Sequence, residues 1–282
     1  MVLESLVNPE LARRKPYDIF FFGVFTASIG LFLSYWVFRQ FSSLIMVFLI
    51  TLASVPFLYF TLKSEESIDL QFLDEKTILK KHSRVLYSLM LLFLGTTFSL
   101  SVWYVLLPTE MVTVLFSSQS QTIVEINNQI TGGVASLGIV ARIFLNNIRV
   151  LVFSVIFAFL YGVGALFILT WNATVIAAAI GNFVRRNVAS SAGAVGLEKV
   201  SAYFSVFSFG ILRYIIHGIP EILAYFVGGL AGGIISMAII NHDLFHAHRE
   251  QIMYDAAELI LIAVGLLFVA SILEVYVTPI LF

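Results

Sequence analysis

The most constraining feature of this sequence is a series of long apolar runs that contain few or no charged residues. They lie at 19–38, 44–62, 85–107, 146–184, 202–240 and 259–281. A helix rises about 1.5 Å per residue, so about 20 apolar residues are needed to cross the hydrocarbon core of a bilayer. Four runs have about that length, and the other two exceed it. The solvent for most of this chain is therefore predicted to be lipid.

The composition supports a membrane protein. The chain is 60% hydrophobic and only 12% charged, with a mean hydropathy of +0.97, against about 45–50% and about 25% in soluble domains. The apolar runs are continuous rather than alternating, which excludes a β-barrel. The predicted fold is an all-α polytopic transmembrane bundle in the cell membrane. It has about six spans plus one or two short or re-entrant helices.

The chain is predicted to form one integral membrane domain over 1–282. Its first part, 1–107, holds three spans and a polar loop at 63–84, and the second part, 141–282, holds the remaining helices. The connection at 108–140 contains no Lys or Arg and is predicted to be a surface loop that ends in an amphipathic helix.

Basic residues predict the orientation, because Lys and Arg concentrate in short cytoplasmic loops. Arg13, Arg14 and Lys15 precede the first run and place the N-terminus inside. After two crossings the loop at 63–84 also lies inside, where its five basic residues fit. After the third crossing, the segment at 108–140 falls outside.

The second half is harder to trace through the membrane. The run at 146–184 predicts a full span to about residue 170, then a short helix after Trp171 and Asn172. The next polar piece, "RRNVASSAGAVGLEK", carries three basic residues and is predicted to lie inside. That placement makes the short helix re-entrant, and the segment 241–252 then faces outside.

The other overlong run contains "RYIIHGIPE", in which Arg213, His217 and Glu221 recur at every fourth position. Gly218 and Pro220 predict an interruption of the helix at 217–221. Ionisable residues in a span mark a functional site by default. We predict that His217 and Glu221 share a proton, with Arg213 as counter-charge. The alternative is an internal ion pair that fixes helix packing.

A second polar stretch, "NHDLFHAHRE", is a candidate metal site. His242 and His246 are four residues apart, which lets two imidazoles bind one ion from one helix face. Asp243 and His248 lie close by. A divalent ion such as zinc is the predicted ligand. The alternative is an interfacial connection between helices, and the HExxH arrangement of zinc proteases is absent.

Two further groups have a structural and a functional interpretation. Asn146 and Asn147 are predicted to cap the span that follows and Arg149 to reach the interface, or all three to contact the His217–Glu221 region. The glycines of the GGLAGG stretch form overlapping small-xxx-small pairs for internal packing or for a seam between two copies. They are Gly228, Gly229, Gly232 and Gly233.

The stretches "FLNNIRVLVFSVIFAFLYGVGALFILTWN" and "HGIPEILAYFVGGLAGGIISMAII" resemble the stage II sporulation protein M family of membrane proteins, including its archaeal relatives. The resemblance lies mainly within 144–240. His217, Gly218 and Glu221 match the family pattern, whereas Arg213 does not belong to it. The glycine that commonly follows the asparagine of "WNATV" is absent here. The resemblance implies a protein that anchors and localises enzymes of the cell envelope.

Three functions remain open from the sequence. The first is a non-enzymatic membrane scaffold or regulator of envelope processes. The second is a transporter, channel or lipid-moving protein with its polar site at His217–Glu221, and the third is an intramembrane metal-dependent hydrolase. The expected partners are the bilayer, other membrane or envelope proteins and a second copy of the chain. No nucleic-acid partner is expected, because the chain has no basic cluster that suggests one, and the net charge of −1 says nothing on this point.

Overall fold

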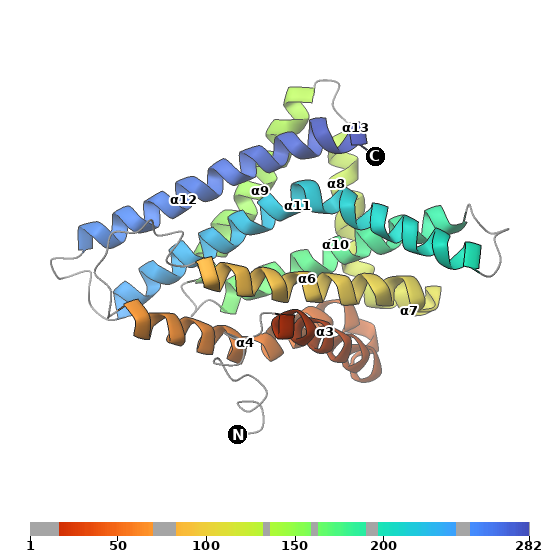
Figure 1. Ribbon diagram of the computed structural model, residues 1–282, viewed down its shortest axis with the longest axis horizontal. Helices are drawn as coiled ribbons and strands as arrows, with labels where there is room; N and C mark the ends of the chain where they lie inside the picture. The colour runs from red at the N-terminus through yellow and green to blue at the C-terminus, as the bar shows by residue number, and fades with distance from the viewer. Residues whose placement is uncertain are drawn as a thin grey trace.

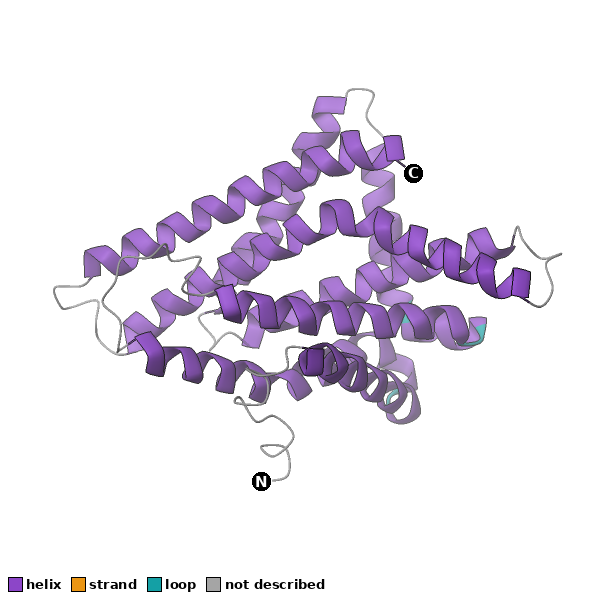
Figure 2. Ribbon diagram, in the orientation of Figure 1, coloured by secondary structure: helices purple, strands orange, loops and turns teal. Residues whose placement is uncertain are grey.

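The computed structural model describes residues 17–69, 83–131, 136–158, 163–189, 197–240 and 249–281, and the described backbone is helical almost throughout (Figure 2). The elements are α3 (Tyr17–Val37), η1 (Arg39–Phe41), α4 (Ser42–Asp69), α6 (Ser83–Leu106), α7 (Thr109–Leu115), α8 (Ser117–Thr131), α9 (Ser136–Ala158), α10 (Val163–Ala189), α11 (Leu197–Ile240), α12 (Arg249–Ile272), the π-helix η3 (Leu273–Val277) and α13 (Thr278–Leu281).

Seven of the described helices are long and apolar enough to cross a membrane. The all-α, polytopic class predicted from the apolar runs is therefore confirmed. Seven candidate spans stand where about six spans and one or two short helices were predicted, because the run at 146–184 is divided at a different place. The residues predicted to form a short re-entrant helix belong instead to the candidate span Leu166–Val188.

The run at 146–184 is broken earlier than predicted. Helix α9 ends at Ala158 and α10 begins at Val163, so that Trp171 and Asn172 lie inside a continuous span. The Asn172 amide donates a hydrogen bond to the Ile168 carbonyl at 2.9 Å. The asparagine is thus satisfied within its own helix, which removes the physical reason for a break at that position.

The predicted interruption at 217–221 is also wrong. Helix α11 is continuous over 44 residues and contains Pro220 in its interior. Figure 1 shows that α11 bends about halfway along its length. A proline removes one hydrogen bond and bends the helix. Neighbouring helices then hold the chain in one helix.

The segment predicted as a surface loop is largely folded. Helices α7 and α8 follow α6, and α8 packs against α4 and α10. Gln119 of α8 is completely buried, and its amide nitrogen donates to the Ser43 carbonyl and the Thr174 hydroxyl at 3.3 and 3.1 Å. The polar composition of this segment did not indicate that α8 would pack inside the molecule.

The helix ends show which connections share a side of the bundle. The end of α4 and the start of α6 lie toward the left of Figure 1, as do the end of α11 and the start of α12. The ends of α6 and α10 lie toward the opposite side. The helix ends that flank 70–82 and 241–248 therefore lie toward the same side, whereas 241–252 was expected to lie opposite to 63–84.

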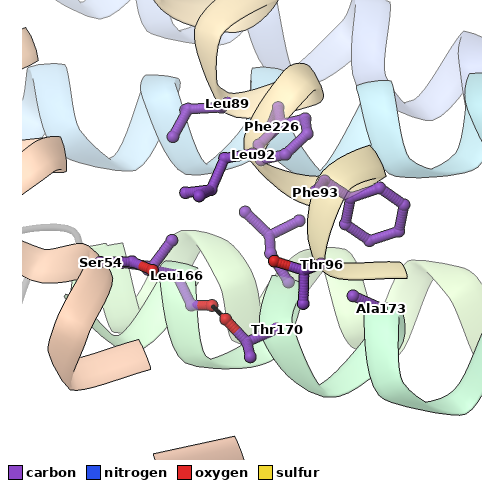
Figure 3. Close-up of a pocket in the computed structure, with 10 residues that line it drawn as sticks. Ser54, Leu89, Leu92, Phe93, Thr96, Leu166, Thr170, Ala173 and Phe226 are labelled. Carbon is purple, nitrogen blue, oxygen red and sulfur yellow. Dashed lines mark hydrogen bonds between the residues drawn. The ribbon is translucent and has the colours of Figure 1, made fainter. Parts of the chain in front are cut away.

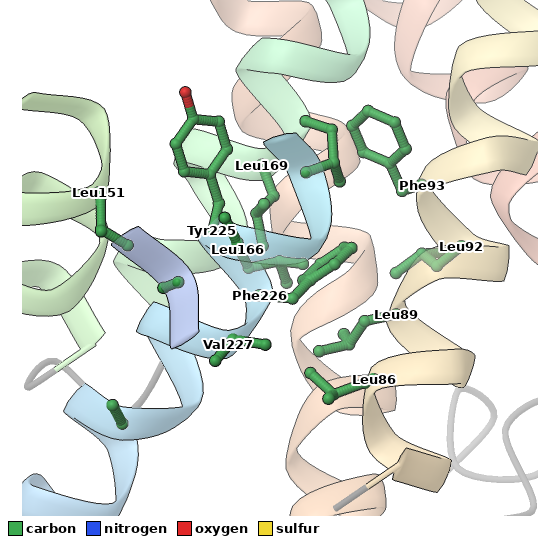
Figure 4. Packing of buried hydrophobic residues seen from close by; sticks show 14 of the residues in the cluster. Leu86, Leu89, Leu92, Phe93, Leu151, Leu166, Leu169, Tyr225, Phe226 and Val227 are labelled. Carbon is green, nitrogen blue, oxygen red and sulfur yellow. The ribbon is translucent and has the colours of Figure 1, made fainter. Parts of the chain in front are cut away.

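The larger apolar core joins α11 to its neighbours. Figure 4 shows Phe226 of α11 packed among Leu89 and Leu92 of α6 and Leu169 of α10. Tyr225 lies beside them with its hydroxyl group pointing away from these leucines.

The glycine-rich part of α11 packs closely on α9. A Cβ atom on Gly232 would lie 2.5 Å from the Val155 carbonyl oxygen, and one on Gly228 would overlap the side chain of Leu151. At Gly233, by contrast, a Cβ would meet nothing within 4 Å. Gly228 and Gly232 therefore serve packing inside the molecule.

Candidate functional site

A stripe of polar residues on α11 faces the C-terminal end of the chain. Arg213, His217 and Glu221 recur every fourth residue, and Tyr225 continues the spacing by one more turn. Residues four apart lie on the same side of a helix. Helix α11 contacts η3 and α13, so the stripe lies at the junction between the last two spans.

Hydrogen bonds fix two members of the stripe. The Tyr225 hydroxyl donates to Glu221 Oε1 at 2.8 Å, and His217 Nδ1 lies 3.2 Å from Thr278 Oγ1. The Thr278 hydroxyl donates its single proton to the Leu273 carbonyl at 3.1 Å. His217 Nδ1 is therefore the donor to Thr278, which leaves Nε2 as an acceptor in the neutral imidazole.

His217 and Glu221 share the stripe as predicted, but each is hydrogen-bonded to a different residue. His217 bonds across to Thr278, whereas Glu221 bonds along its own helix to Tyr225. The ring of Tyr214 meets the His217 ring edge-on, with 6.1 Å between the centroids. The imidazole is thus held between α11 and the C-terminal helix.

Glu274 is the residue that sequence reasoning missed. It lies in η3 and is within electrostatic range of Glu221, Tyr225 and Tyr214. A π-helical turn holds an extra residue, and such turns are frequent at functional sites. The sequence feature that could have identified Glu274 as a site residue is that it is the single charged residue in the last apolar run, 259–281.

Arg213 points toward α10. Its guanidinium carbon lies 5.6 Å from the centre of the Phe183 ring, a cation–π arrangement. Its charge acts on Tyr214 and His217. Arg213 therefore lies near His217, at one end of the stripe. The carboxyl group that lies within electrostatic range of Glu221 is that of Glu274.

The predicted supporting residues on α9 do not begin a helix. Because α9 starts at Ser136, Asn146, Asn147 and Arg149 lie well inside it and cap nothing. Asn147 is buried, with 5% of its surface exposed, and α9 contacts both α11 and η3. Asn146 and Arg149 are exposed. An arginine that faces lipid near the centre of a span costs at least about 2.5 kcal/mol on insertion scales.

The predicted metal ligands lie outside the described residues, which exclude 241–248. They are His242, Asp243, His246 and His248. Within the parts of the chain that the structure does describe, no group of three or more His, Asp or Glu is placed to hold a metal ion.

A small cavity lies beside the apolar core rather than in the polar stripe. Figure 3 shows Ser54 of α4, Thr96 of α6 and Thr170 of α10 among the leucines and phenylalanines that line it. The Thr170 hydroxyl donates to the Leu166 carbonyl at 2.8 Å. The cavity volume of about 10 Å³ is the space of one water molecule.

The arrangement brings ionisable side chains from two different spans together. Glu221 and His217 come from α11, whereas Glu274 comes from η3. Such groups are costly inside a membrane and line pathways or fix helix contacts there. The cluster can therefore carry protons, or it can hold the two spans in one geometry.

Comparison with known proteins gives a match to a family model. The model described as Stage II sporulation protein M matches residues 88–279. This range covers most of α6 and the later helices as far as Pro279, and it extends well beyond the 144–240 stretch that carries the resemblance. It also includes Glu274. No curated protein and no solved structure matches the chain.

Proposed function

The chain belongs to the stage II sporulation protein M family, whose model covers most of its length, and from that premise we propose that it is a non-enzymatic membrane scaffold or regulator of envelope processes. Membership of this family and the seven apolar helices among the described residues both fit a multi-pass membrane protein.

The observation that carries this proposal is the bonded junction between the last two spans. His217 bonds to Thr278 across the junction, and Glu221 is held by Tyr225. Polar groups that bond to each other in this way fix the relative position of two spans. A scaffold requires such a fixed surface, because partner proteins must find the same helices in the same place.

The test is purification of the full chain from native membranes in a mild detergent, followed by native mass spectrometry. We expect a defined envelope protein to remain bound at fixed stoichiometry. Thr278→Val, which removes the bond to His217, should weaken that association, whereas Thr113→Val on the exposed α7 should not. Recovery of the chain alone under all mild conditions would contradict the scaffold role.

A second candidate function is a proton-coupled transporter or channel. It is favoured by a specific observation: two carboxyl groups from neighbouring spans lie within electrostatic range, one beside a proline bend and one in a π-helix. Intramembrane acids of this kind form proton relays in transporters, and irregular helices accompany such sites.

This candidate is tested with purified chain in liposomes that enclose a pH-sensitive dye. Proton flux is expected to fall at least tenfold in Glu221→Gln and in Glu274→Gln. Glu110→Gln, on the exposed first turn of α7, should leave flux unchanged. Flux that is absent in the wild-type chain, or that persists unchanged in both variants, excludes the cluster as a proton path.

A further inference from the structure

The exposed arginine in the middle of α9 requires a partner that lipid does not provide. Arg149 lies on the outward side of the span Leu137–Ala158, together with the exposed Asn146 one turn earlier. Among the described residues, Arg149 has neither a hydrogen bond nor an ion pair. Arginine side chains in spans normally face protein or a water-filled space.

Arg149 is too far from either end of α9 to reach the membrane surface easily. It lies nine residues before Ala158, which corresponds to about 13 Å along the helix axis. The distance to the start of the span at Leu137 is longer still. An extended arginine side chain is shorter than either distance, so snorkelling does not remove the guanidinium from the apolar zone.

The neighbouring helix α12 carries the complementary charge. Glu258 is exposed on the outward side of the span Met253–Leu281, and within the described chain it too has no bonded partner. It lies five residues after Met253, about 7 Å from the start of the span. Figure 1 shows that α9 ends and α12 begins toward the same side of the bundle. Arg149 and Glu258 thus both lie in the half of their span that is nearest to these two helix ends.

These two helices also form the least covered part of the molecule. Only 28% of the α9 window and 33% of the α12 window are buried, against 56% for α10. The two helices contact each other, and in Figure 1 α9 begins at the upper edge of the bundle, along which α12 runs. In a twofold interface the same patch of each copy faces the other, so that the patch must carry both complementary groups. This surface carries the exposed Arg149 and the exposed Glu258.

We infer that the outward sides of α9 and α12 form an interface with a second copy of this chain, in which Arg149 of each copy pairs with Glu258 of the other. A twofold axis normal to the membrane brings the α9–α12 surface of each copy against the same surface of the other. This inference is independent of the proposed function, because it rests on residues outside the His217–Glu274 cluster.

Cysteine cross-linking tests the geometry, and the natural chain contains no cysteine that would interfere. Val152→Cys on α9 and Leu261→Cys on α12 each replace an exposed residue one turn beyond the pair. Differently tagged copies that carry one cysteine each are mixed in liposomes at low protein density and oxidised. We expect a disulfide-linked dimer between the two tags. The control pair, Phe25→Cys on α3 and Phe48→Cys on α4, should stay at background.

Charge exchange tests the pairing. Arg149→Glu should lower the dimer fraction at least tenfold, and Arg149→Glu combined with Glu258→Arg should restore it. Arg186→Glu, at an exposed arginine near the end of α10, should have no effect. If Arg149→Glu does not fold, Arg149→Gln is measured in the same assay and should lower the dimer fraction at least threefold.

Three results would overturn the inference. The first is cross-linking at background level in the wild-type charge context, which would mean that the face is covered by lipid or by a different protein. The second is a dimer fraction that stays unchanged in both Arg149 variants, and the third is failure of the charge exchange to restore dimers. Loss of proton flux or of an envelope partner would leave these measurements unaffected.

Discussion

Two junctions between spanning helices use opposite means to bring the helices together. Between α3 and α6, glycines allow the backbones to approach closely, and a Cβ atom on Gly23 would lie 2.6 Å from the Leu92 carbonyl oxygen. Hydroxyl groups complete that junction, because Ser28 lies 3.0 Å from Ser99 and accepts a hydrogen bond from the Trp103 indole at 3.0 Å. No ionisable side chain contributes to these bonds.

Between α11 and the C-terminal elements η3 and α13, ionisable groups take part in the junction. His217 bonds to Thr278, and Glu274 lies within electrostatic range of Glu221. Small residues and hydroxyls give close packing at low cost in a bilayer, whereas acids in a span are expensive. The difference leads us to expect that the first junction serves stability and that the second serves function. Each of the following substitutions tests that division.

The largest effect is expected for Gly95→Ala at the α3–α6 junction. A methyl group there would overlap the backbone of Phe20, which cannot move away as a side chain can. We expect a loss of about 2–3 kcal/mol in the free energy of unfolding, measured by denaturant titration in mixed micelles. Gly138→Ala, where a Cβ meets nothing within 4 Å, should be neutral or should stabilise by up to about 1 kcal/mol. Equal effects of the two variants would disprove the close approach.

The next effect is expected for Tyr225→Phe. This change removes the hydroxyl that donates to Glu221 at 2.8 Å while the ring stays in the apolar core. A bond to a carboxylate contributes more than a neutral one, so we expect a loss of about 1.5 kcal/mol. The same substitution in a Glu221→Gln background should cost less than half as much. Equal losses in both backgrounds would show that the bond does not couple the two residues.

A smaller effect, of opposite sign, is expected for Glu274→Gln. The amide keeps the shape of the side chain and removes one of two carboxyl groups that lie within range of each other. Because residues retained for function are often costly for stability, we expect a gain of about 1 kcal/mol. A loss of the same size would show that Glu274 is a structural residue, like Ser99, and would remove the contrast between the junctions.

The sequence predicts the fold class and most of one helix face at the site. Run length and low charge are sufficient to identify spans, and four-residue spacing places Arg213, His217 and Glu221 on one side of α11. Neither signal depends on tertiary contacts, which is why both predictions hold. Run length fails at 146–184, because length alone does not show where a run that holds two spans is divided.

The remaining features depend on contacts that a single sequence does not show. Asn172 and Pro220 resemble helix breakers, yet Asn172 bonds to its own helix and α11 continues through Pro220. Glu274 is visible in the sequence as a lone acid, but its relation to Glu221 depends on the π-helix and on the packing of α11 against it. The exposure of Arg149 follows from where α9 begins, which the apolar run places ten residues too late.

The smallest effect is expected for Ser99→Ala, which tests how much the hydroxyl groups contribute to the α3–α6 junction. The Ser99 hydroxyl donates to the Val24 carbonyl at 3.1 Å, but that carbonyl also accepts a bond from Ser28 at 2.8 Å. Loss of Ser99 therefore leaves no buried group without a partner there, so we expect a loss of only about 0.6 kcal/mol. The unfolding titration used for Gly95→Ala measures it. A loss above about 1.5 kcal/mol would mean that hydroxyl bonds, rather than close backbone packing, hold α3 to α6.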